Sequence, residues 1–453
     1  MIFLMDVDHK YQATLLYLFS QFPQYQRIGS GAYKSGLEGM LALDKALDHP
    51  HQRFTSIHIA GTNGKGSVSG MLAAILQSAG FKVGLYTSPH LIDFRERIRI
   101  NGIMIPKEEV LRFIDDYKPL LNKVRPSFFE ITTAMAFHYF AHQMVDIAVI
   151  ETGLGGRLDS TNVINPILSV ITNIGLDHCE YLGHTLPLIA TEKAGIIKAH
   201  TPVVIGERDP QTDSVFIARA QELQAPLYFA QNKFNVTQIE QKGDHQHFFI
   251  SDTDKKWDGH YLSDLMGLYQ QKNVPTLLQA VDLLPQGIGI ETVKQGLKDA
   301  AQTTGLRARW ERIAFQPKII VDAAHNAHGI KWVVEQLKKE QYRRLHFVLG
   351  VVMEKDLDSI LSILPQDATY YYTQAQIPRA LDANVLAKQC EHAGLKGKVI
   401  VGVKEALTTA IKNANPDDLI FVGGSIFVAA EALATDISSR DYRHTTNRAC
   451  AAV

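Results

Sequence analysis

A glycine-rich segment between an apolar run and a helical pattern carries the strongest chemical signal. It reads AGTNGKGS from Ala60 to Ser67 and follows the β-branched run SIHIA. Glycines let successive backbone N–H groups surround an anion, Lys65 can reach the outer phosphates of a nucleotide, and the Ser67 hydroxyl can bind magnesium. The match to a Walker A loop is incomplete, because Ile59 stands at the first consensus glycine and Gly66 follows the lysine. We predict a phosphate-binding loop; the alternative is an ordinary glycine-rich turn with an exposed lysine.

Acidic and histidine side chains follow two further strand patterns. Glu151 ends the run VDIAVIE, at a strand's carboxyl end, where ligands gather in open α/β sheets, and is a candidate magnesium ligand. Asp177 and His178 end the segment ITNIGLDH in the same way. Magnesium prefers oxygen ligands, whereas histidine is more typical of zinc or manganese sites. A helix N-cap role for Asp177 and a surface position for His178 are the alternatives.

Lys193, in EKAGIIK near the end of a predicted helix, allows two interpretations. It can pair with a carboxylate or with the helix C-terminus. If its pKa is lowered, the amine can instead react with carbon dioxide to form a carbamate, which turns a cation into an oxygen ligand for a second metal.

Asp322 and His325 follow the strand pattern KIIV in the C-terminal part of the chain. Both therefore lie at a strand's carboxyl end. They are either part of a site facing the first domain, or a helix N-cap with an incidental histidine.

Short β-branched runs alternate with longer helical patterns along most of the chain, which is typical of parallel sheets covered by helices. Residues 232–258 break this rhythm, and their polar alternation around Gly243 predicts antiparallel strands. The polar break Thr303-Thr304-Gly305 follows two helical patterns, and the alternation restarts after it. We therefore expect two α/β domains, 1–303 and 304–453, the second doubly wound.

Composition narrows the class of protein. The chain has 453 residues, and its 46 basic against 47 acidic residues give a net charge of -1. This balance offers no broad basic surface for nucleic acid or anionic lipid. The three cysteines form no CxxC pair, and the longest apolar run, 419–430, is interrupted by glycines and is too short to span a membrane. We expect a cytoplasmic protein that binds neither nucleic acid nor membrane, with 419–430 forming a strand, a turn and a helix.

Six motifs occur in a fixed order: AGTNGKGS, LYTSPHL followed by ERIRING, ETGLGGRLDSTN, ITNIGLDH, EKAGIIK and VDAAHN. Together they resemble the folylpolyglutamate synthase and dihydrofolate synthase family, ATP-dependent amide ligases related to the Mur ligases. The resemblance runs from about Gly29 to about Ser425. It implies an α/β fold with a P-loop NTPase-like central domain, whose sheet is rich in parallel strands, and a smaller C-terminal Rossmann-like domain.

The resemblance also implies roles for individual residues. ATP contacts fall on the loop residues Thr62, Asn63, Gly64, Lys65, Gly66 and Ser67 and on Asn273, Arg309 and Asp322. By the resemblance, Ser67 binds one magnesium ion, and Glu151 and His178 bind the other. Lys193 matches the family's carbamylated lysine. Lys65, His178 and Lys193 are the implied catalytic residues. The residues implied to bind glutamate are Ser88 and His325. Those implied to bind the pterin are Gly36, Leu37, Phe129, Glu130, Leu158 and Asp159.

The implied reaction activates a pterin-linked carboxylate as an acyl phosphate, which the amino group of L-glutamate then attacks. We expect a bifunctional enzyme that uses dihydropteroate and also extends reduced folates through the γ-carboxylate. A synthase limited to the second reaction is the nearest alternative; a Mur ligase and a non-ligase P-loop nucleotide switch are more remote. The implied cofactors are ATP and two magnesium ions, with a monovalent cation left open, and the implied assembly is a monomer acting on small molecules.

Three positions depart from the family pattern. Family members often have valine where this chain has Thr152, and glycine where it has Ala308 and Ala323. None of these removes a side chain that performs chemistry, so the departures bear on local loop geometry and leave the implied reaction unchanged.

Overall fold

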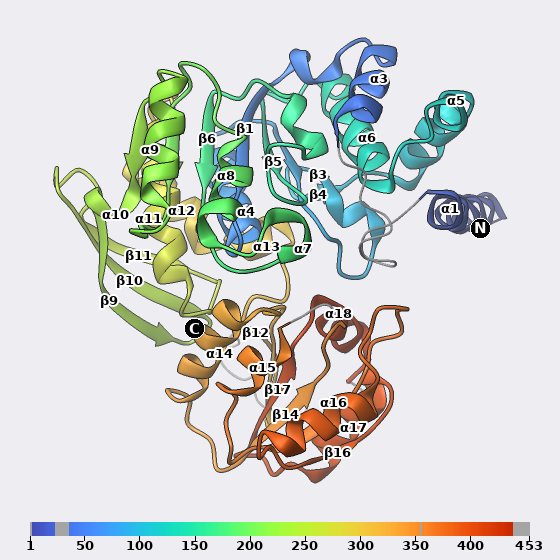
Figure 1. Cartoon of the computed structure of the whole chain (residues 1–453), viewed down its shortest axis with the longest axis vertical. Helices are drawn as coiled ribbons and strands as arrows, with labels where there is room; N and C mark the ends of the chain where they lie inside the picture. Colours follow the sequence, from blue (N-terminus) through green and yellow to red (C-terminus); the bar gives the residue numbers. More distant parts are fainter. Residues whose placement is uncertain (1, 23–35, 354–355, 438–453) are drawn as a thin grey trace, which may run out of the picture. The chain divides into compact units, whose positions relative to one another are not determined.

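The computed structural model describes residues 2–22, 36–353 and 356–437 (Figure 1). Two compact units, Met1–Leu306 and Arg307–Val453, divide the chain and are described separately below as unit 1 and unit 2. Gly29, where the family resemblance begins, lies outside the described residues.

An eight-stranded sheet forms the centre of unit 1, in the order β4–β3–β2–β5–β1–β6–β7–β8. The strands from β2 to β8 along this sheet are parallel, whereas β3 and β4 join antiparallel at one edge. Parallel strands buried on both faces need apolar side chains on both, which explains the β-branched runs. The strands are β1 (Thr55–Ala60), β2 (Val83–Tyr86), β3 (Ile98–Ile100), β4 (Ile103–Met104), β5 (Ile147–Glu151), β6 (Leu168–Ile171), β7 (Val203–Ile205) and β8 (Leu227–Phe229).

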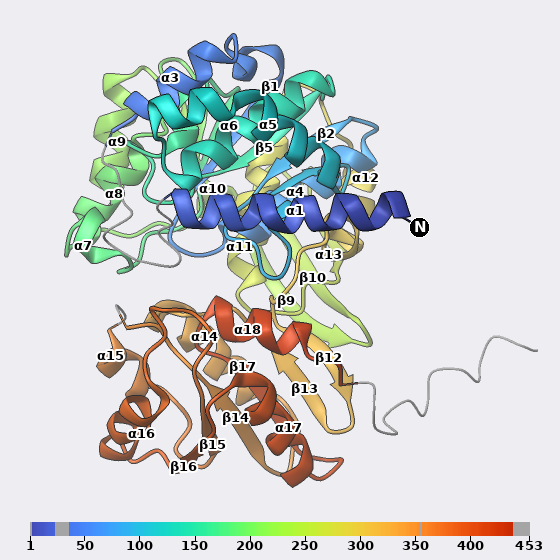
Figure 2. The same cartoon turned by 90° about the vertical axis from the view of Figure 1, so that its right-hand side faces the viewer.

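Alternate residues of these strands enter two different cores. Ile147 and Val149 of β5 pack with α4 (Lys65–Ser78), α11 (Gln270–Asp282) and α12 (Ile290–Lys298). Ala148 and Ile150 point the other way, as the two-residue period of a strand requires, and pack with α3 (Glu38–Ala46), α5 (Lys107–Val124) and α6 (Phe128–His142). Both views place α1 (Ile2–Gln21) beside α5 (Figure 2).

Shorter helices complete unit 1, and none of the described helices is both long and apolar enough to cross a membrane. The shorter helices of unit 1 are η2 (Pro50–Arg53), η3 (Phe94–Arg97), η4 (Ser160–Val163), α7 (Cys179–Leu182), α8 (Leu186–Ala194), α9 (Asp213–Glu222), α10 (Ala230–Lys233) and α13 (Ala300–Thr304).

A small antiparallel sheet packs on the α4 side of unit 1. Strand β9 (Phe234–Lys242) turns at Gly243, whose φ of 60° favours glycine, into β10 (His245–Asp252). Strand β11 (Gly259–Ser263) pairs with the other edge of β10. The antiparallel strands predicted from the polar alternation of 232–258 are confirmed.

Unit 2 holds a six-stranded sheet in the order β12–β13–β17–β14–β15–β16, in which only β12 is antiparallel. The apolar run 419–430 forms β17, a turn and α18, as predicted. The strands are β12 (Glu311–Phe315), β13 (Lys318–Val321), β14 (Leu345–Leu349), β15 (Thr369–Tyr372), β16 (Gly397–Val399) and β17 (Leu419–Gly423). The helices are α14 (Ala327–Leu337), α15 (Leu357–Leu361), α16 (Ala383–His392), α17 (Val403–Asn413) and α18 (Ile426–Ala434).

Candidate functional site

Four neighbouring parallel strands of unit 1 end at the same edge of the sheet, in the order β2–β5–β1–β6. Their register pairs Ile59 with Glu151 and Ala60 with Ile171, so the strand ends are level. The segments that follow are therefore neighbours: the loop with Ser88 after β2, Glu151 at the end of β5, the glycine-rich loop after β1 and the segment to His178 after β6. Most of the predicted site residues of unit 1 lie along this edge.

The glycine-rich loop closes tightly onto α4. Gly64 precedes the helix with a φ of 83°, and a methyl group there would lie 2.3 Å from Oδ1 of Asn273. This close approach requires glycine and brings Asn273 of α11 to the loop. The Lys65 Nζ folds back over the loop and donates to the carbonyl oxygens of Gly61 (3.1 Å) and Thr62 (3.3 Å).

The backbone amides of the loop divide into two groups. Those of Thr62 and Asn63 donate to Asn173, to its carbonyl oxygen (3.0 Å) and its Oδ1 (2.9 Å) respectively. The amides of the first turn of α4, including Gly66 and Ser67, have no acceptor within the helix. In this structure the first turn of α4, which carries the helix's partial positive charge, presents the amides suited to a phosphate.

A chain of buried side chains connects α4 with α11. The Gln270 amide donates to Ser67 Oγ (3.2 Å) and accepts from Asn273 Nδ2 (2.7 Å). Sequence reasoning missed Gln270, because 203 positions separate it from Ser67 and no motif joins them. It positions the hydroxyl that the sequence assigned to magnesium.

Glu151 is a buried carboxylate, 4% exposed, that accepts a hydrogen bond from the Ser88 amide (3.3 Å). The buried guanidinium of Arg97 interacts electrostatically with it, and Arg97 Nε donates to Nδ1 of His90 (2.8 Å). Burial lowers the pKa of Arg97, and the charge of Glu151 opposes this shift. Sequence reasoning gave Arg97 no role, although an arginine inside the apolar pattern ERIRI is a sign of a buried cation.

Lys193 lies near the end of α8 and is only 4% exposed. Its Nζ donates to the carbonyl oxygen of Gly61 (2.9 Å), so its acceptor is not a carboxylate. Burial, followed by the charge of Lys65, lowers the pKa of Lys193 to about 7. About half of the amines are then neutral at pH 7, as a reaction with carbon dioxide requires.

His178 precedes α7 in a left-handed conformation, with a φ of 52°. The Asp177 carboxylate accepts the His178 backbone N–H (2.9 Å), and its other oxygen lies 4.0 Å from the imidazole Nε2. His178 rather than Asp177 therefore occupies the N-cap position of α7, and its ring remains partly exposed at the strand edge.

Some of the predicted pterin residues have local structural roles. Glu130 forms a capping box at the start of α6: its carboxylate accepts the Ser127 N–H (2.5 Å), and its own N–H donates to Ser127 Oγ (3.2 Å). Gly36 (φ 119°) and Leu37 lie just before α3. A methyl group on Gly39 of that helix would lie 2.2 Å from the Glu130 carboxylate, so the starts of α3 and α6 lie close together.

Phe129 packs against the glycines that follow β5. A methyl group on Gly153 would lie 2.5 Å from the Phe129 ring, whose centroid is 5.9 Å from that of Tyr86. Phe129 and Leu158 are both half-buried. An aromatic face at this position suits a flat ring, and packing between α6 and the loop uses the same side chain.

Asp159 organises the segment between β5 and η4. One carboxylate oxygen accepts the amides of Gly153 (2.8 Å) and Leu154 (2.7 Å), and the other accepts the amide (3.0 Å) and hydroxyl of Thr161. Burial raises the pKa of Asp159, and these hydrogen bonds oppose that shift.

We expect Asp159→Ala to lower the free energy of unfolding by about 2–4 kcal/mol, because it leaves buried donors without an acceptor. Chemical denaturation of the variant measures this loss. Unchanged stability would contradict this structural role, whereas weaker folate binding in the same variant would support the pterin contact that the family resemblance implies.

In unit 2, Asp322 follows β13 and joins two loops. Its carboxylate accepts the amides of Trp310 (2.7 Å) and Ala324 (2.8 Å), so the segment with Arg309 is held beside the segment with His325. The Arg309 guanidinium donates to the carbonyl oxygen of Ala308 (3.1 Å). The His325 Nδ1 lies 3.0 Å from the carbonyl oxygen of Ala323. The three predicted residues of unit 2 are thus brought together, and Asn326 rather than Asp322 caps α14.

Ala308 has a φ of 57°, a left-handed conformation that glycine adopts more easily than alanine. We expect Ala308→Gly to stabilise the chain by about 1 kcal/mol, as measured by thermal or denaturant unfolding. Ala323→Gly is the matched control, because Ala323 is not left-handed and should gain nothing. Equal effects of the two substitutions would contradict this explanation of the departure at Ala308.

Each of the two units contains a match to a known family of domains. Residues 59–280 match the Mur ligase middle domain, and residues 308–426 match the Mur ligase glutamate ligase domain. The folylpolyglutamate synthase of Lacticaseibacillus casei is 32% identical over 431 residues, which cover 93% of this chain and 97% of that relative. The chain belongs to the folylpolyglutamate synthase and dihydrofolate synthase family. This membership, within the Mur ligase superfamily, confirms the resemblance inferred from the six motifs.

Other members of the family agree in sequence and fold. A dihydrofolate synthase/folylpolyglutamate synthase of Bacillus subtilis is 35% identical over 360 residues, covering 77% of this chain and 83% of the relative. The chain spans about half (48%) of a probable bifunctional folylpolyglutamate synthase/dihydropteroate synthase of Haloferax volcanii, with 33% identity over 413 residues and 89% of this chain covered.

Solved structures of the family confirm the predicted α/β fold class with its parallel-rich sheets. E. coli FolC in complex with DHPP and ADP superposes with a TM-score of 0.79 at 28% identity, covering 94% of this chain and 97% of that one. A Yersinia pestis folylpolyglutamate synthase/dihydrofolate synthase with AMPPNP and a Mn ion has the same TM-score, 0.79, the same identity, 28%, and the same two coverages, 94% and 97%.

Proposed function

We propose that this chain is an ATP-dependent ligase that joins L-glutamate to a folate-type carboxylate. The observation that carries the proposal is the meeting of three groups at one sheet edge: the glycine-rich loop, the buried carboxylate of Glu151, and the buried amine of Lys193 bonded to Gly61. The relatives named above supply the substrate class, since they are called folylpolyglutamate and dihydrofolate synthases.

ATP fits the glycine-rich loop. The amides of the first turn of α4, which have no acceptor within the helix, the Lys65 ammonium and the first-turn dipole all favour a triphosphate. Asn273 lies against the loop. Charge on the transferring phosphoryl group is then stabilised by Lys65 and by these amides. From unit 2, Arg309 and Asp322 are proposed as further ATP contacts. The central and glutamate ligase domains are proposed as 1–303 and 304–453.

The donor set also fits divalent metal ions. Ser67 Oγ and the Glu151 carboxylate are buried oxygen donors of the kind that magnesium prefers, and His178 adds a nitrogen donor that manganese also accepts. We propose one ion at Ser67 and a second at Glu151 and His178. Bound there, these ions would neutralise negative charge on the phosphates.

Lys193 is proposed to act as a carbamate. The ammonium first loses a proton; the neutral amine then attacks carbon dioxide, a C–N bond forms as one C=O π bond opens, and a second proton is released. A buried cation thereby becomes a buried carboxylate-like anion. The lowered pKa of about 7 supports this step, because the amine loses its proton near neutral pH. The carbamate would lie near Gly61 and supply an oxygen beside the metal site.

The reaction proposed is the one that the family resemblance implies. An oxygen of the folate carboxylate attacks the γ-phosphorus of ATP, and ADP leaves. The amino nitrogen of glutamate then attacks the acyl carbon, phosphate leaves, and the nitrogen loses a proton. Ser88 and His325 are proposed for glutamate, and Gly36, Leu37, Phe129, Glu130, Leu158 and Asp159 for the pterin side.

The test is ATP-dependent incorporation of labelled L-glutamate, with dihydropteroate and with tetrahydrofolate as acceptors. We expect labelled product with both acceptors, which defines a bifunctional enzyme. Product with tetrahydrofolate alone would leave a folylpolyglutamate synthase. ATP hydrolysis without any glutamate-containing product would overturn the ligase in favour of a nucleotide switch. We further propose that the enzyme works as a cytoplasmic monomer on small molecules.

A further inference from the structure

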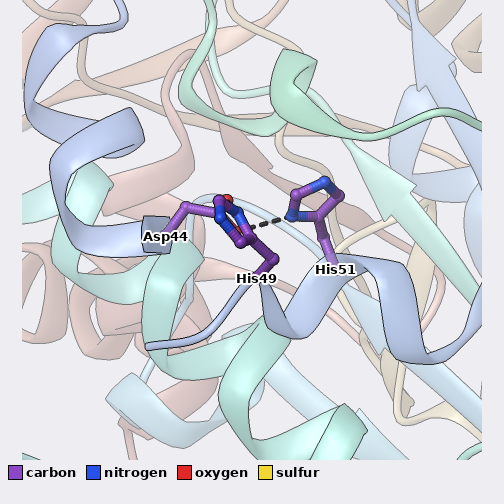
Figure 3. A group of neighbouring side chains, drawn as sticks. All are labelled: Asp44, His49 and His51. Carbon is purple, nitrogen blue, oxygen red and sulfur yellow. Dashed lines mark hydrogen bonds and ion pairs between the residues drawn. The ribbon is translucent and has the colours of Figure 1, made fainter. Parts of the chain in front are cut away.

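One carboxylate and two imidazoles meet where α3 ends and η2 begins, away from the proposed ATP site. The Nδ1 atoms of His49 and His51 each lie 2.6 Å from a different oxygen of Asp44. Figure 3 shows both rings gathered around this carboxylate. One ligand atom from each of the three residues lies within 4.8 Å of the other two.

The backbone between these residues is bent to bring them together. Asp48 and His49 are both left-handed, with φ of 59° and 50°, and the His49 amide donates to the Asp44 carbonyl oxygen (2.9 Å). Left-handed residues other than glycine cost conformational free energy. The turn therefore places two imidazoles on one carboxylate at a conformational cost.

The charge of Asp44 needs compensation. Its side chain is 3% exposed, and its ion pairs within the described residues are with His49 and His51. Buried carboxylates are retained when they are paired with a cation or bind a metal. An imidazole is a cation only when protonated, whereas a metal ion compensates the carboxylate with both rings neutral.

The donor set selects a class of metal. Two imidazole nitrogens and one carboxylate oxygen suit zinc and neighbouring transition metals, whereas magnesium and calcium prefer oxygen alone. The His51 side chain is 8% exposed and that of His49 is 46% exposed, so two ligands are inside and the third leaves a path from solvent. We propose that Asp44, His49 and His51 bind one transition metal ion of the zinc class, with water at the remaining position.

The three side chains could coordinate a zinc ion after a small movement of their ligand atoms. Zinc–ligand bonds of about 2.0–2.1 Å in a tetrahedral site separate two ligand atoms by roughly 3.3 Å. The present contacts of 2.6 Å would therefore open by roughly 0.7 Å. The half-exposed His49 ring can supply this movement at its own contact, and the buried contact between His51 and Asp44 would have to open by the same amount.

The metal would act as a structural clamp. It would join the end of α3 to η2, which leads into the amino end of β1, whereas the phosphate loop lies at the carboxyl end. Five rises of about 3.3 Å along β1, from Thr55 to Ala60, separate the two ends by roughly 16 Å. This site is thus distinct from the proposed magnesium site and does not depend on the proposed ligase activity.

The experiment compares metal binding by four proteins, each a full-length chain with any tag removed and stripped of metal by a chelator. They are the wild type, the His49→Ala/His51→Ala double variant, Asp44→Asn, and His392→Ala, which removes an exposed histidine of α16 as the matched control. Zinc binding is measured by calorimetry, and cobalt binding by its visible absorption. Any metal that binds at Glu151 and His178 is common to all four proteins and cancels in the comparison.

We expect wild type and His392→Ala to bind one more equivalent of zinc than the double variant. In Asp44→Asn the affinity of this site should fall at least about 10-fold. Zinc should raise the Tm of the wild type and of His392→Ala, and should have less effect on the Tm of the double variant and of Asp44→Asn. Equal stoichiometry and affinity in all four would overturn the proposal and leave two imidazoles that only hydrogen-bond Asp44. If the double variant fails to fold, His49→Ala alone decides, because its ring is half-exposed.

Discussion

Replacing Lys193 with alanine is expected to reduce glutamate ligation at least about 100-fold, the loss typical when one electrostatic group is removed from a transition state. The lysine is 4% exposed and bonds a loop carbonyl rather than a carboxylate. Alanine leaves a small cavity where the carbamate would stand. Acetate or propionate in the assay should therefore restore part of the activity by occupying that space as a carboxylate.

Lys198→Ala is the matched control, since Lys198 lies five positions further along the same segment and donates to the Asn162 carbonyl oxygen (2.9 Å). It should keep most of the activity and show no rescue. Full turnover of Lys193→Ala in buffer free of carbon dioxide would contradict the carbamate, as would rescue of both variants to the same degree.

The same lysine predicts how activation depends on pH. Burial depresses its pKa from 10.5 to about 7, so the amine is mostly protonated below pH 7 and mostly neutral above it. Only the neutral amine reacts with carbon dioxide. In enzyme freed of carbon dioxide, the rate of reactivation by bicarbonate should rise with pH through a midpoint near 7. A rate that is flat between about pH 6 and pH 8, after correction for dissolved carbon dioxide, would exclude this lysine as the modified group.

Glu151→Gln is expected to lower turnover at least about 100-fold at ordinary magnesium concentration, because it removes the charge proposed to hold a metal. The glutamine oxygen can still accept the Ser88 amide, so the local loop should keep its geometry. Turnover measured against magnesium concentration should recover partly at high magnesium, since the defect is in metal affinity. Circular dichroism and thermal unfolding check the fold, because the buried Arg97 also interacts with Glu151.

Glu222→Ala provides the comparison for Glu151→Gln, since Glu222 is exposed and pairs with Arg219 on α9. It should retain the magnesium dependence of the wild type. Near-normal turnover of Glu151→Gln at ordinary magnesium would remove Glu151 from the metal site.

Local patterns predicted much of the architecture. Buried parallel strands need apolar side chains on both faces, so β1, β5 and β17 were readable as continuous β-branched runs. The hairpin at Gly243 was predicted because buried and partly exposed residues alternate along β10. The short antiparallel strands β3 and β4 were not predicted, since they are only three and two residues long and carry too little periodicity.

The sequence by itself determined the chemistry available to this protein. The glycines, lysine and serine of AGTNGKGS suffice for a phosphate loop because their roles are local, and the ordered motifs suffice for the family.

Only the tertiary structure decided what each polar group does. It turned the Thr62 and Asn63 amides toward Asn173, gave Asp159 and Glu130 hydrogen bonds to the backbone of a turn and a helix cap, and brought Gln270 to Ser67. It also buried Lys193 deeply enough to depress its pKa, and folded Asp44 against two histidines. Burial and partners arise from segments far apart in the chain, so no local pattern can specify them; they decide whether a carboxylate, an amine or an imidazole is a ligand, a reactant or a structural bond.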